Sequence, residues 1–577
     1  MNSRVLKIDL SKNSFAIQDR KELFNDWIGG VGVGTQLLKE ELKLEADPLS
    51  EDNVIIFSIG PFTPAYPLAT KTVALFKSPL TGEWGESHAG GRTATSIAHA
   101  GYGAIVIKGI SKNPVYLVIE DGNVLFRDAR VIWGIEDSRI TGRIIAEREE
   151  GKGTRTVMAI GGAGEKLVRY ASVTTETYRH FGRLGLGAIF GSKNLKAVMI
   201  RGKSSKIPEN ANIYRDTYNK IFKIATESEA MKKYHLIGTS ANILTLNQIG
   251  GLPTRNLTSN KFENGDNISG ENIGEKYLGR RIACNHCPTA CIHIASLREP
   301  YENKNYFFKT LMISYDYELI YALGSMLGVG SADGILKLIH KVESYAIDAM
   351  STGVCLAWAT EALKEGLIST KDTLIDFEFG NYQKYLNGIE YLVKQPTDFY
   401  KNLAEGVRKA SDVYGGKDYA LAFGKNEMPG YHTGPACHIG DLIGLRHSHL
   451  DNAGYSLDQK GKEFDIEELV DELVEEEMWR QVLSSLVVCF FARNVYTPEI
   501  VCEAFKPLGV SIDKETLEDL GKKIYLEKLR LKQKMGFNIN SLNIPDRIFQ
   551  TESSKGKISK DYITQALDYY SKKMGKV

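Results

Sequence analysis

The sequence of 577 residues has few cysteines, almost no net charge and no long apolar run. Seven cysteines are too few for a disulfide framework and suggest a reducing compartment, in which clustered thiols indicate metal binding. The formal net charge of +1 gives no basic surface for nucleic acid. No apolar run reaches the roughly 18 residues of a membrane span, and the start, MNSRVLKIDLSKNSF, lacks the apolar core of a signal peptide. We therefore expect a cytoplasmic protein without a membrane span.

The character of the sequence changes near residue 206. Residues 1–206 are rich in glycine and in short β-like runs such as NVIIFSIG, TVALFK, GAIVIKG and PVYLVIE. Longer segments with helical periodicity follow, among them FDIEELVDELVEEEMWRQVLSSLVVCFFARN, which predicts one helix that includes Cys489. The acidic run EELVDELVEEE within it is interpreted as a solvated helix face. We predict an α+β fold, in which a β-rich N-terminal domain (1–206) precedes two mainly α-helical domains (207–415 and 416–577).

Three of the cysteines, Cys284, Cys287 and Cys291, lie in the short stretch IACNHCPTACIHIA. Thiolates are soft ligands that select zinc, copper(I) or iron–sulfur clusters. A four-iron cluster needs a fourth thiolate, usually from a distant part of the chain. A zinc site remains an alternative to the cluster, because His286 and His293 lie nearby and could serve as ligands. The spacing favours an iron–sulfur cluster, and it does not choose among the four remaining thiols. These are Cys355, Cys437, Cys489 and Cys502.

Two glycine-rich stretches also stand out, KSPLTGEWGESHAGG (77–91) and RHFGRLGLGAIFGSKNLKAV (179–198). Glycines at this density let backbone amides approach an anion closely, and nearby arginine or lysine adds positive charge. Neither stretch completes a dinucleotide-binding fingerprint or a P-loop. Tight turns between strands explain either stretch alone. Together with the cysteine cluster, they favour a large phosphorylated cofactor that is not a simple nucleotide.

The whole chain resembles the aldehyde:ferredoxin oxidoreductase family of tungsten enzymes. The segments that carry the resemblance, in family order, include KIDLSKNSF, WIGGVGVGTQLL, FKSPLTGEWGESHAGG, AGYGAIVIKG, GRLGLGAIFGSKNLKAV, CNHCPTAC, YDYELIYALGS, IDAMSTG, LVVC and IPDRIF. The resemblance implies a β-rich domain beneath a tungsten bis-pyranopterin (tungstopterin) cofactor and two helical domains above it. It also implies a [4Fe-4S] cluster close by and Mg²⁺ bridging the two pterin phosphates.

The resemblance also implies ligands. The family's fourth cluster cysteine closes a late D-x-x-G-x-C motif, which here is SSLVVC and ends at Cys489, although its aspartate and glycine are missing. The cluster ligands would be Cys284, Cys287, Cys291 and Cys489. The partner motif D-x-x-G-L-D reads ESYAID here. The implied cofactor contacts are Lys71, His88, Gly90, Gly91, Arg179, His180, Arg183, Glu343, Ile347, Asp348, Ser484 and Val488. Backbone carbonyls at positions 88 and 180 would bind the Mg²⁺.

For catalysis, the family supplies a glutamate and a histidine, which move protons and hydrogen-bond to the substrate carbonyl. Glu318, in YDYE, matches the glutamate, and Asp316 is the alternative carboxylate. Of the histidines in GLRHSHLDN, His449 is preferred and His447 is second. Some family members hold a mononuclear iron with E-x-x-H. This chain has the sequence KLIH, from Lys337 to His340, at that place, so we predict no such iron.

The expected activity is the oxidation of aldehydes to carboxylic acids with water as the oxygen source. Electrons would leave through the cluster to ferredoxin or a ferredoxin-like iron–sulfur subunit. An alternative within the family is a reductive tungsten subunit of the aryl-CoA (benzoyl-CoA) reductase type. An alternative from a different class is a non-catalytic zinc-binding scaffold.

Overall fold

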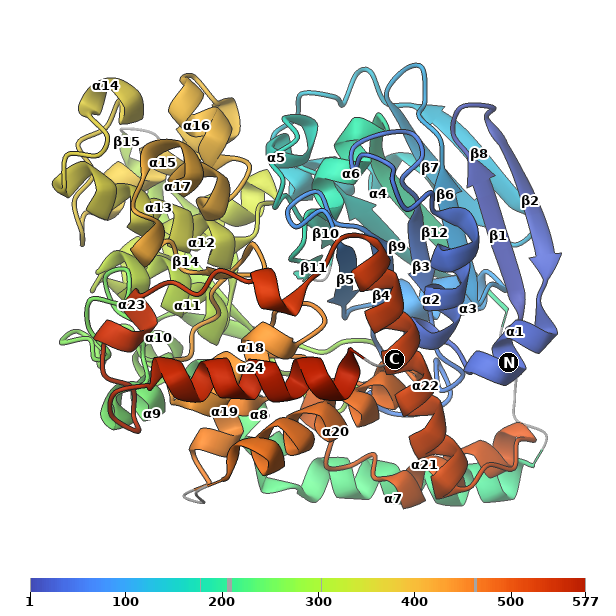
Figure 1. The fold of residues 1–577 in the computed structure, drawn as a ribbon. Helices are drawn as coiled ribbons and strands as arrows, with labels where there is room; N and C mark the ends of the chain where they lie inside the picture. The colour runs from blue at the N-terminus through green and yellow to red at the C-terminus, as the bar shows by residue number, and fades with distance from the viewer. Residues whose placement is uncertain (1, 177, 205–209, 302–303, 461–463, 576–577) are drawn as a thin grey trace.

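Two six-stranded β-sheets form the N-terminal part of the computed structural model, which describes residues 2–176, 178–204, 210–301, 304–460 and 464–575 (Figure 1). The first sheet has the strand order β2 (Ser14–Asp19), β1 (Arg4–Asp9), β6 (Ala104–Lys108), β3 (Ile55–Ser58), β4 (Thr72–Lys77), β5 (Trp84–Ala89). The second has the order β11 (Arg179–Phe181), β10 (Val173–Thr175), β9 (Thr154–Ala159), β12 (Leu195–Gly202), β7 (Val115–Glu120), β8 (Asn123–Asp128). The β-like runs of the sequence are thus confirmed as strands.

The two sheets share one hydrophobic core. Ile105 from β6, Leu117 from β7 and Val198 from β12 are fully buried in it. Strands that are covered on both faces read as continuous apolar runs, which is why GAIVIKG and PVYLVIE do not alternate strictly. Strands β5 and β11, each at the edge of its sheet, contact each other. Two edges that carry unpaired backbone groups therefore meet at one seam.

Helices make up most of the described chain after residue 210 and lie to the left of the two sheets and below them in Figure 1. The N-terminal part contains α1 (Lys21–Trp27), α2 (Gly30–Glu41), α3 (Thr93–His99), α4 (Ser138–Arg148), α5 (Gly162–Glu165) and α6 (Leu186–Ser192). The middle part contains α7 (Ala211–Glu227), α8 (Glu229–Leu236), α9 (Asn242–Ile249), α10 (Gly270–Tyr277), α11 (Tyr317–Leu323), α12 (Ala332–Tyr345), α13 (Ala349–Lys364), α14 (Thr370–Thr373), α15 (Tyr382–Lys394), α16 (Asp398–Leu403) and α17 (Val407–Tyr414). The last part contains a short hairpin, β16 (Ala422–Phe423) and β17 (Asn426–Glu427), and then α18 (Pro435–Ile443), α19 (Gly454–Asp458), α20 (Ile466–Ser485), α21 (Pro498–Phe505), α22 (Lys514–Lys534), α23 (Arg547–Gln550) and α24 (Lys560–Met574).

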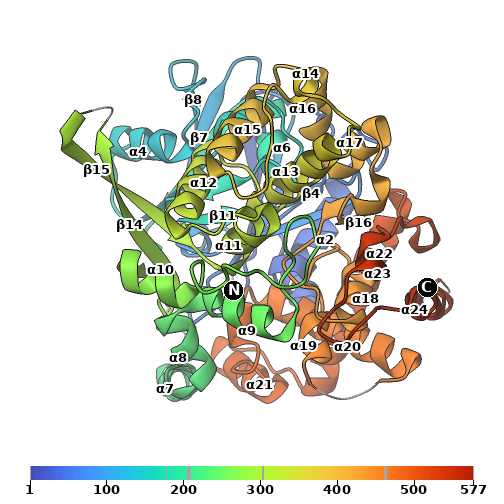
Figure 2. The ribbon, with the colours of Figure 1, turned by 90° about the vertical axis from the view of Figure 1, so that its left-hand side faces the viewer.

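A three-stranded antiparallel sheet interrupts the helices, and the sequence analysis missed it. It consists of β13 (Leu278–Ile282), β14 (Ile292–Tyr301) and β15 (Lys304–Tyr315). The hairpin of β14 and β15 extends from the body of the molecule in Figure 2. The three clustered cysteines lie in the connection between β13 and β14, and Cys291 immediately precedes β14. The sheet therefore fixes both ends of the thiol loop.

Helix α20 ends earlier than its periodicity predicts. It stops at Ser485, and Val487 takes a left-handed conformation with φ 54°. Cys489 then begins a 3₁₀ turn, so it follows the helix instead of lying in it, which corrects the expected placement. The acidic run is helical as predicted, but not all of it is solvated. Glu477 is 1% exposed and accepts a hydrogen bond from the backbone N–H of Leu445 at 3.1 Å.

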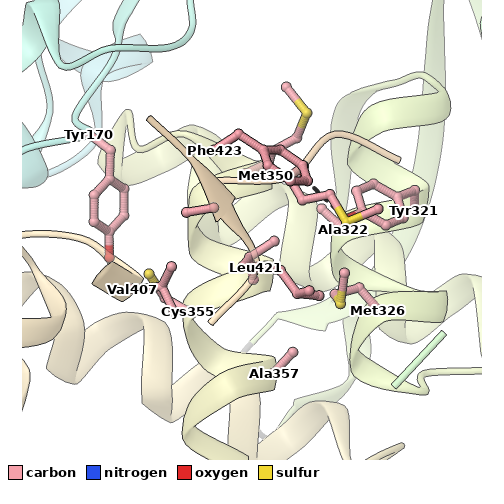
Figure 3. Packing of buried hydrophobic residues seen from close by; sticks show 14 of the residues in the cluster. Tyr170, Tyr321, Ala322, Met326, Met350, Cys355, Ala357, Val407, Leu421 and Phe423 are labelled. Atoms are coloured by element: carbon pink, nitrogen blue, oxygen red, sulfur yellow. Dashed lines mark hydrogen bonds between the residues drawn. The ribbon is translucent and has the colours of Figure 1, made fainter. Parts of the chain in front are cut away.

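The helical part has a continuous hydrophobic core that includes residues on both sides of position 415, so the boundary between 415 and 416 stays a prediction. In Figure 3 the Tyr170 ring points toward Cys355 of α13, close to Val407. The Cys355 sulfur is fully buried and lies 4.0 Å from the carbonyl oxygen of Leu403. Cys355 is thus a packing residue of this core.

Among the helices that the structure describes, none is by itself long and apolar enough to cross a membrane. The segments Tyr317–Leu327 and Ala332–Tyr345 meet the length and composition criteria only as a pair, with a bend of 115° between them.

Candidate metal and cofactor site

Four of the seven cysteines come together where the sheets meet the helices. Burial raises the pKa of Cys287 to about 11 and that of Cys291 to about 12, and in both cases the neighbouring Cys284 and Cys489 thiols raise it further. Such mutual effects require the late Cys489 to lie close to the mid-chain triplet. The structure therefore brings together the four residues that the resemblance implies as cluster ligands.

A short strap, residues 68–71, joins the late cysteine to the thiol loop. The backbone N–H of Cys489 donates to the carbonyl of Leu68 at 2.9 Å, and that of Lys71 donates to Val487 at 3.0 Å. On the other side, the N–H of Leu68 donates to the carbonyl of His286 at 3.2 Å. Backbone hydrogen bonds thus set the position of Cys489 relative to the triplet, whatever the side chains at the D-x-x-G-x-C positions.

Glycines of α2 allow that helix to pack closely against the end of α20. The N–H of Gly32 donates to the Ser485 hydroxyl at 3.1 Å. A Cβ at Gly30 would overlap the backbone of Ser484 and Ser485. The glycine-rich WIGGVGVG segment therefore serves close packing. The buried Val488 continues the cap of α20, since its N–H donates to the Leu483 carbonyl at 2.9 Å.

The sulfur atoms of the four cysteines are not arranged as zinc requires. In the described part of the chain, Cys437, His438 and Asp441 are the group of potential metal ligands whose donor atoms all lie within 4.8 Å of one another, and no such group includes the four thiols. Tetrahedral zinc with bonds of about 2.3 Å needs sulfurs roughly 3.8 Å apart. A four-iron cluster holds its ligand thiolates further apart, because each one binds a different corner of the cube.

Two cations and a glycine turn border the thiols. A Cβ at Gly90 would lie 2.8 Å from Sγ of Cys284, 3.6 Å from Nζ of Lys71 and 3.7 Å from Cγ of Arg179. Any other residue at position 90 would crowd the thiol. Gly91, with φ 96°, accepts a hydrogen bond from the N–H of Asn285 in the thiol loop at 2.9 Å. The predicted phosphate contacts therefore converge beside the cysteines.

The seam of the two sheets carries His88 on β5 and His180 on β11. His88 is held by Glu86, whose Oε1 lies 2.7 Å from its Nε2. Nε2 of His180 lies 4.0 Å from Oε1 of Glu343, at the end of α12. Burial, reinforced by neighbouring arginines, lowers the pKa of His180 to about 4, so this histidine is neutral at pH 7. Burial raises the pKa of Glu343 to about 8, and neither of its carboxylate oxygens has a hydrogen-bond partner among the described residues.

Arg183 connects the second glycine-rich stretch to α13. Its Nε lies 3.1 Å from Oδ2 of Asp348, and its Nη2 donates to the Glu427 carbonyl at 2.7 Å. Its Nη1 is buried without a partner in the described structure. Asp348 also caps α13 by accepting from the N–H of Met350 at 3.1 Å. The predicted contact Ile347 is fixed next to it by a β-bridge to Ala171.

Glu318 and His449 form the central pair of the site. Oε1 of Glu318 lies 3.2 Å from Nε2 of His449, and the Tyr431 ring centroid is 5.0 Å from that of His449. Burial and the nearby Asp316 raise the pKa of Glu318 to about 8, and burial lowers the pKa of His449 to about 3. At pH 7 a largely protonated carboxyl therefore faces a neutral imidazole. Oε2 of Glu318 and Nδ1 of His449 have no partner within the described residues.

The structure does not bring His447 to Glu318. Both ring nitrogens of His447 are engaged, since Nε2 lies 2.7 Å from Nζ of Lys532 and Nδ1 lies 3.0 Å from the Asp441 carbonyl. The sequence analysis missed Asp441, which is 1% exposed and whose pKa is raised well above its usual range by burial and by the neighbouring charges of Asp451 and Glu318. Asp441 lies three residues before the segment GLRHSHLDN, and nothing in its spacing distinguishes it from an aspartate on a helix surface. Tyr431 belongs to no motif that the sequence analysis identified, so its position beside His449 could not be predicted.

A buried ion network anchors β5 to the C-terminal helices. Oε2 of Glu86 lies 2.6 Å from Nζ of Lys528 in α22, and Oε1 lies 3.5 Å from Nη1 of Arg446. Burial alone would raise the pKa of Glu86. The two cations outweigh burial and hold this pKa well below its usual range. The network fixes the edge strand that carries His88 relative to the last helices.

The KLIH segment takes part in other contacts. Nζ of Lys337 lies 2.8 Å from Asp333 and 3.1 Å from Glu299, and Nδ1 of His340 lies 3.1 Å from Nη1 of Arg139. The expectation that no mononuclear iron binds here stays a prediction.

The architecture consists of two sheets, a helical cover and a thiol site between them, as expected for an enzyme that carries a redox cofactor. Comparison with known proteins identifies its family. Residues 5–202 match the N-terminal domain of aldehyde ferredoxin oxidoreductase, and residues 216–575 match domains 2 and 3 of that enzyme. The chain belongs to the aldehyde ferredoxin oxidoreductase family. The proteins to which it is similar include tungsten-containing oxidoreductases.

The similarity extends over most of the chain. A tungsten-containing aldehyde ferredoxin oxidoreductase of Thermococcus kodakarensis is 32% identical over 440 residues, which cover 74% of this chain and 70% of the relative. The WOR-like subunit of an aliphatic sulfonate oxidoreductase of Pyrococcus furiosus is 29% identical over 433 residues, covering 71% and 67%. The active-site complex of benzoyl coenzyme A reductase with 1,5-dienoyl-CoA contains a chain of the same fold, with a TM-score of 0.83 and 20% identity over 100% of this chain and 94% of that one.

Proposed function

We propose that this protein is a tungsten-dependent oxidoreductase that oxidises aldehydes to carboxylic acids and passes the electrons through a [4Fe-4S] cluster to ferredoxin or a ferredoxin-like subunit. The observation that carries the proposal is the Glu318–His449 pair, at 3.2 Å, in the same site as four converging cysteines. Asp316 links the two features, because its carboxylate lies 4.0 Å from Arg179, which borders the thiols.

The unpaired polar atoms of the site fit a large polar cofactor. Buried polar groups are normally hydrogen-bonded, yet Arg183, Glu318, Glu343 and His449 all have buried side-chain atoms without partners in the described structure. All four were predicted from the sequence to contact cofactor or substrate. A bis-pyranopterin would be held by Lys71, Arg179 and the Gly90–Gly91 turn at its phosphates. Backbone carbonyls of the β5–β11 seam, at positions 88 and 180, would take Mg²⁺.

The reaction adds one oxygen atom from water to the aldehyde and releases two electrons and two protons. When bound, the tungsten cofactor supplies a Lewis acid and a two-electron acceptor. Glu318, once deprotonated, accepts a proton from the attacking water. His449, neutral and with an N–H to donate, orients the carbonyl and stabilises the negative charge that develops on its oxygen. Tyr431 packs beside the imidazole and limits its movement.

A surface pocket offers a route for electrons out of the site. Its lining includes Cys284 and Cys287 together with Arg92, Tyr218, Phe222 and His286. Two of the proposed cluster ligands therefore lie beneath a surface that an electron carrier can reach. A carrier docked there would approach the cluster without passing the substrate.

An assay of both reaction directions tests the proposed function. We expect protein purified without oxygen to reduce a viologen dye with short or aromatic aldehydes and to form the matching acid. The second candidate is the reductive reaction on an aryl-CoA thioester, which is favoured by the full-length similarity in fold to the benzoyl-CoA reductase chain. To test this second candidate, the same preparation is incubated with benzoyl-CoA and a low-potential electron donor, and reduction of the thioester substrate is measured.

The preparation must first contain tungsten and iron in a ratio near one to four, which is the content of one tungstopterin and one four-iron cluster. Given that ratio, failure on every aldehyde together with reduction of the thioester would replace the first function by the second. A zinc-only preparation would rule out both functions.

A further inference from the structure

A second cluster of potential metal ligands lies on α18, separate from the four thiols. Cys437, His438 and Asp441 present one ligand atom each, all within 4.8 Å of one another. They are 3%, 0% and 1% exposed. In a helix, positions i and i+4 share a face, and position i+1 is three residues from i+4, so one ion can contact all three side chains.

The protonation of His438 follows from its hydrogen-bond chain. Nε2 of His432 lies 3.0 Å from the Thr551 carbonyl, which can only accept, so that nitrogen carries the proton. Neutral His432 then accepts at Nδ1, where Nε2 of His438 lies 2.8 Å away and must donate. Nδ1 of neutral His438 is left with a free lone pair, and no described residue donates to it. A histidine that binds a metal through one ring nitrogen typically donates its other N–H to a neighbouring acceptor, as His438 does to His432.

Asp441 faces the same point with both carboxylate oxygens unpartnered among the described residues. An uncompensated carboxylate that is 1% exposed is costly and requires a proton or a cation. Cys437 completes the group, and because a metal ion displaces the proton of a ligating thiol, it would bind as a thiolate. One sulfur, one imidazole and one carboxylate therefore lie within reach of a single ion, and neither Nδ1 of His438 nor the carboxylate of Asp441 has a partner in the described structure.

We propose that Cys437, His438 and Asp441 bind a single Zn²⁺ ion. One thiolate, one imidazole and one carboxylate suit zinc, which takes sulfur, nitrogen and oxygen ligands in a tetrahedral arrangement. The S–H of Cys437 donates to the carbonyl of Tyr431 at 3.4 Å, so binding of the ion, which removes that proton, would replace this contact with the loop whose Tyr431 ring packs on His449. The ion has a site of its own on α18, because none of its three ligands belongs to the four thiols or to the predicted cofactor contacts.

Zinc content measured on untagged holoenzyme, produced with zinc in the medium and dialysed against a weak chelator, tests the site. We expect about one zinc per chain in the wild type and less than about a tenth of that in His438→Ala and Asp441→Asn. Cys502→Ser is the matched control, because this partly exposed cysteine of α21 lies outside every ligand group found in the described residues, and it should retain the zinc. Tungsten and cluster iron are measured in the same samples and should not follow the zinc.

Zinc K-edge spectroscopy of the wild type keeps the test independent of variant folding. It should show one sulfur at about 2.3 Å with nitrogen and oxygen at about 2.0 Å. Absence of zinc from the wild type, full retention in both ligand variants, or a first shell without sulfur would each overturn the site. The first of these results would mean that a proton shared by Asp441 and His438 fills the cluster.

Discussion

Cys489→Ala should remove the iron–sulfur cluster or leave it damaged. With only three thiolates, one corner of a four-iron cluster lacks its protein ligand. We expect iron to fall from about four per chain to three or fewer, and aldehyde-dependent dye reduction to fall by at least about a hundredfold, because electrons lose their exit. Iron and acid-labile sulfide analysis, with electron paramagnetic resonance of the reduced protein, measures the loss.

The control is Cys502→Ala. Cys502 lies in α21 and packs against the core that includes Val487, so its replacement removes a thiol without touching the site. Its iron content should equal that of the wild type. The Cys489 N–H bond to Leu68 is a backbone contact that alanine preserves, so a general loss of folding is not expected. Equal iron in the two variants would remove Cys489 from the ligand set.

Glu318→Gln should lower the turnover of aldehydes by about 10²- to 10⁴-fold, the usual contribution of a general base. Glutamine keeps the size of the side chain, so cofactor and iron content should stay unchanged. The pH profile gives the sharper readout. A base acts only when deprotonated, and burial raises the pKa of Glu318 to about 8, so the wild-type rate should rise with pH through an inflection near 8. The variant should lack this inflection.

Asp316→Asn distinguishes the two carboxylates of the YDYE segment. Asp316 caps α11 by accepting from the N–H of Leu319 at 3.3 Å, and asparagine caps a helix about as well as aspartate, so the variant should fold normally. The asparagine variant should therefore keep most of its turnover, with an inflection at lower pH, since removal of the negative charge beside Glu318 lowers its pKa. An unchanged pH profile in Glu318→Gln would show that another group acts as the base.

The sequence predicted the parts of the fold that follow from local pattern. Runs such as TVALFK became strands because covered strands are uniformly apolar. Periodicity failed at α20, because the residues from Leu486 to Asn494 continue the apolar spacing while backbone bonds to the 68–71 strap end the helix. The sheet of β13–β15 was missed because its pairing is set by the surrounding tertiary structure and not by a local propensity.

For the site, residue types could be predicted but not their partners. The four cysteines and Glu318 were identified from motifs, and the structure brings them into one region. The preference for His449 over His447 could not be tested by the sequence, because the contacts of His447 with Lys532 and with the Asp441 carbonyl come from distant parts of the fold and from a helix end. Asp441 was missed because its unpartnered carboxylate results from burial by distant segments, which leaves no trace in the spacing of residues.

Anomalous diffraction from a crystal of anaerobically purified protein tests the central claim most directly. Maps at the iron and tungsten edges should show iron bounded by the sulfurs of Cys284, Cys287, Cys291 and Cys489. They should also show one tungsten close to Glu318 and His449. Iron without contact to Cys489, or the absence of a heavy metal between the sheets and the helical cover, would contradict the account.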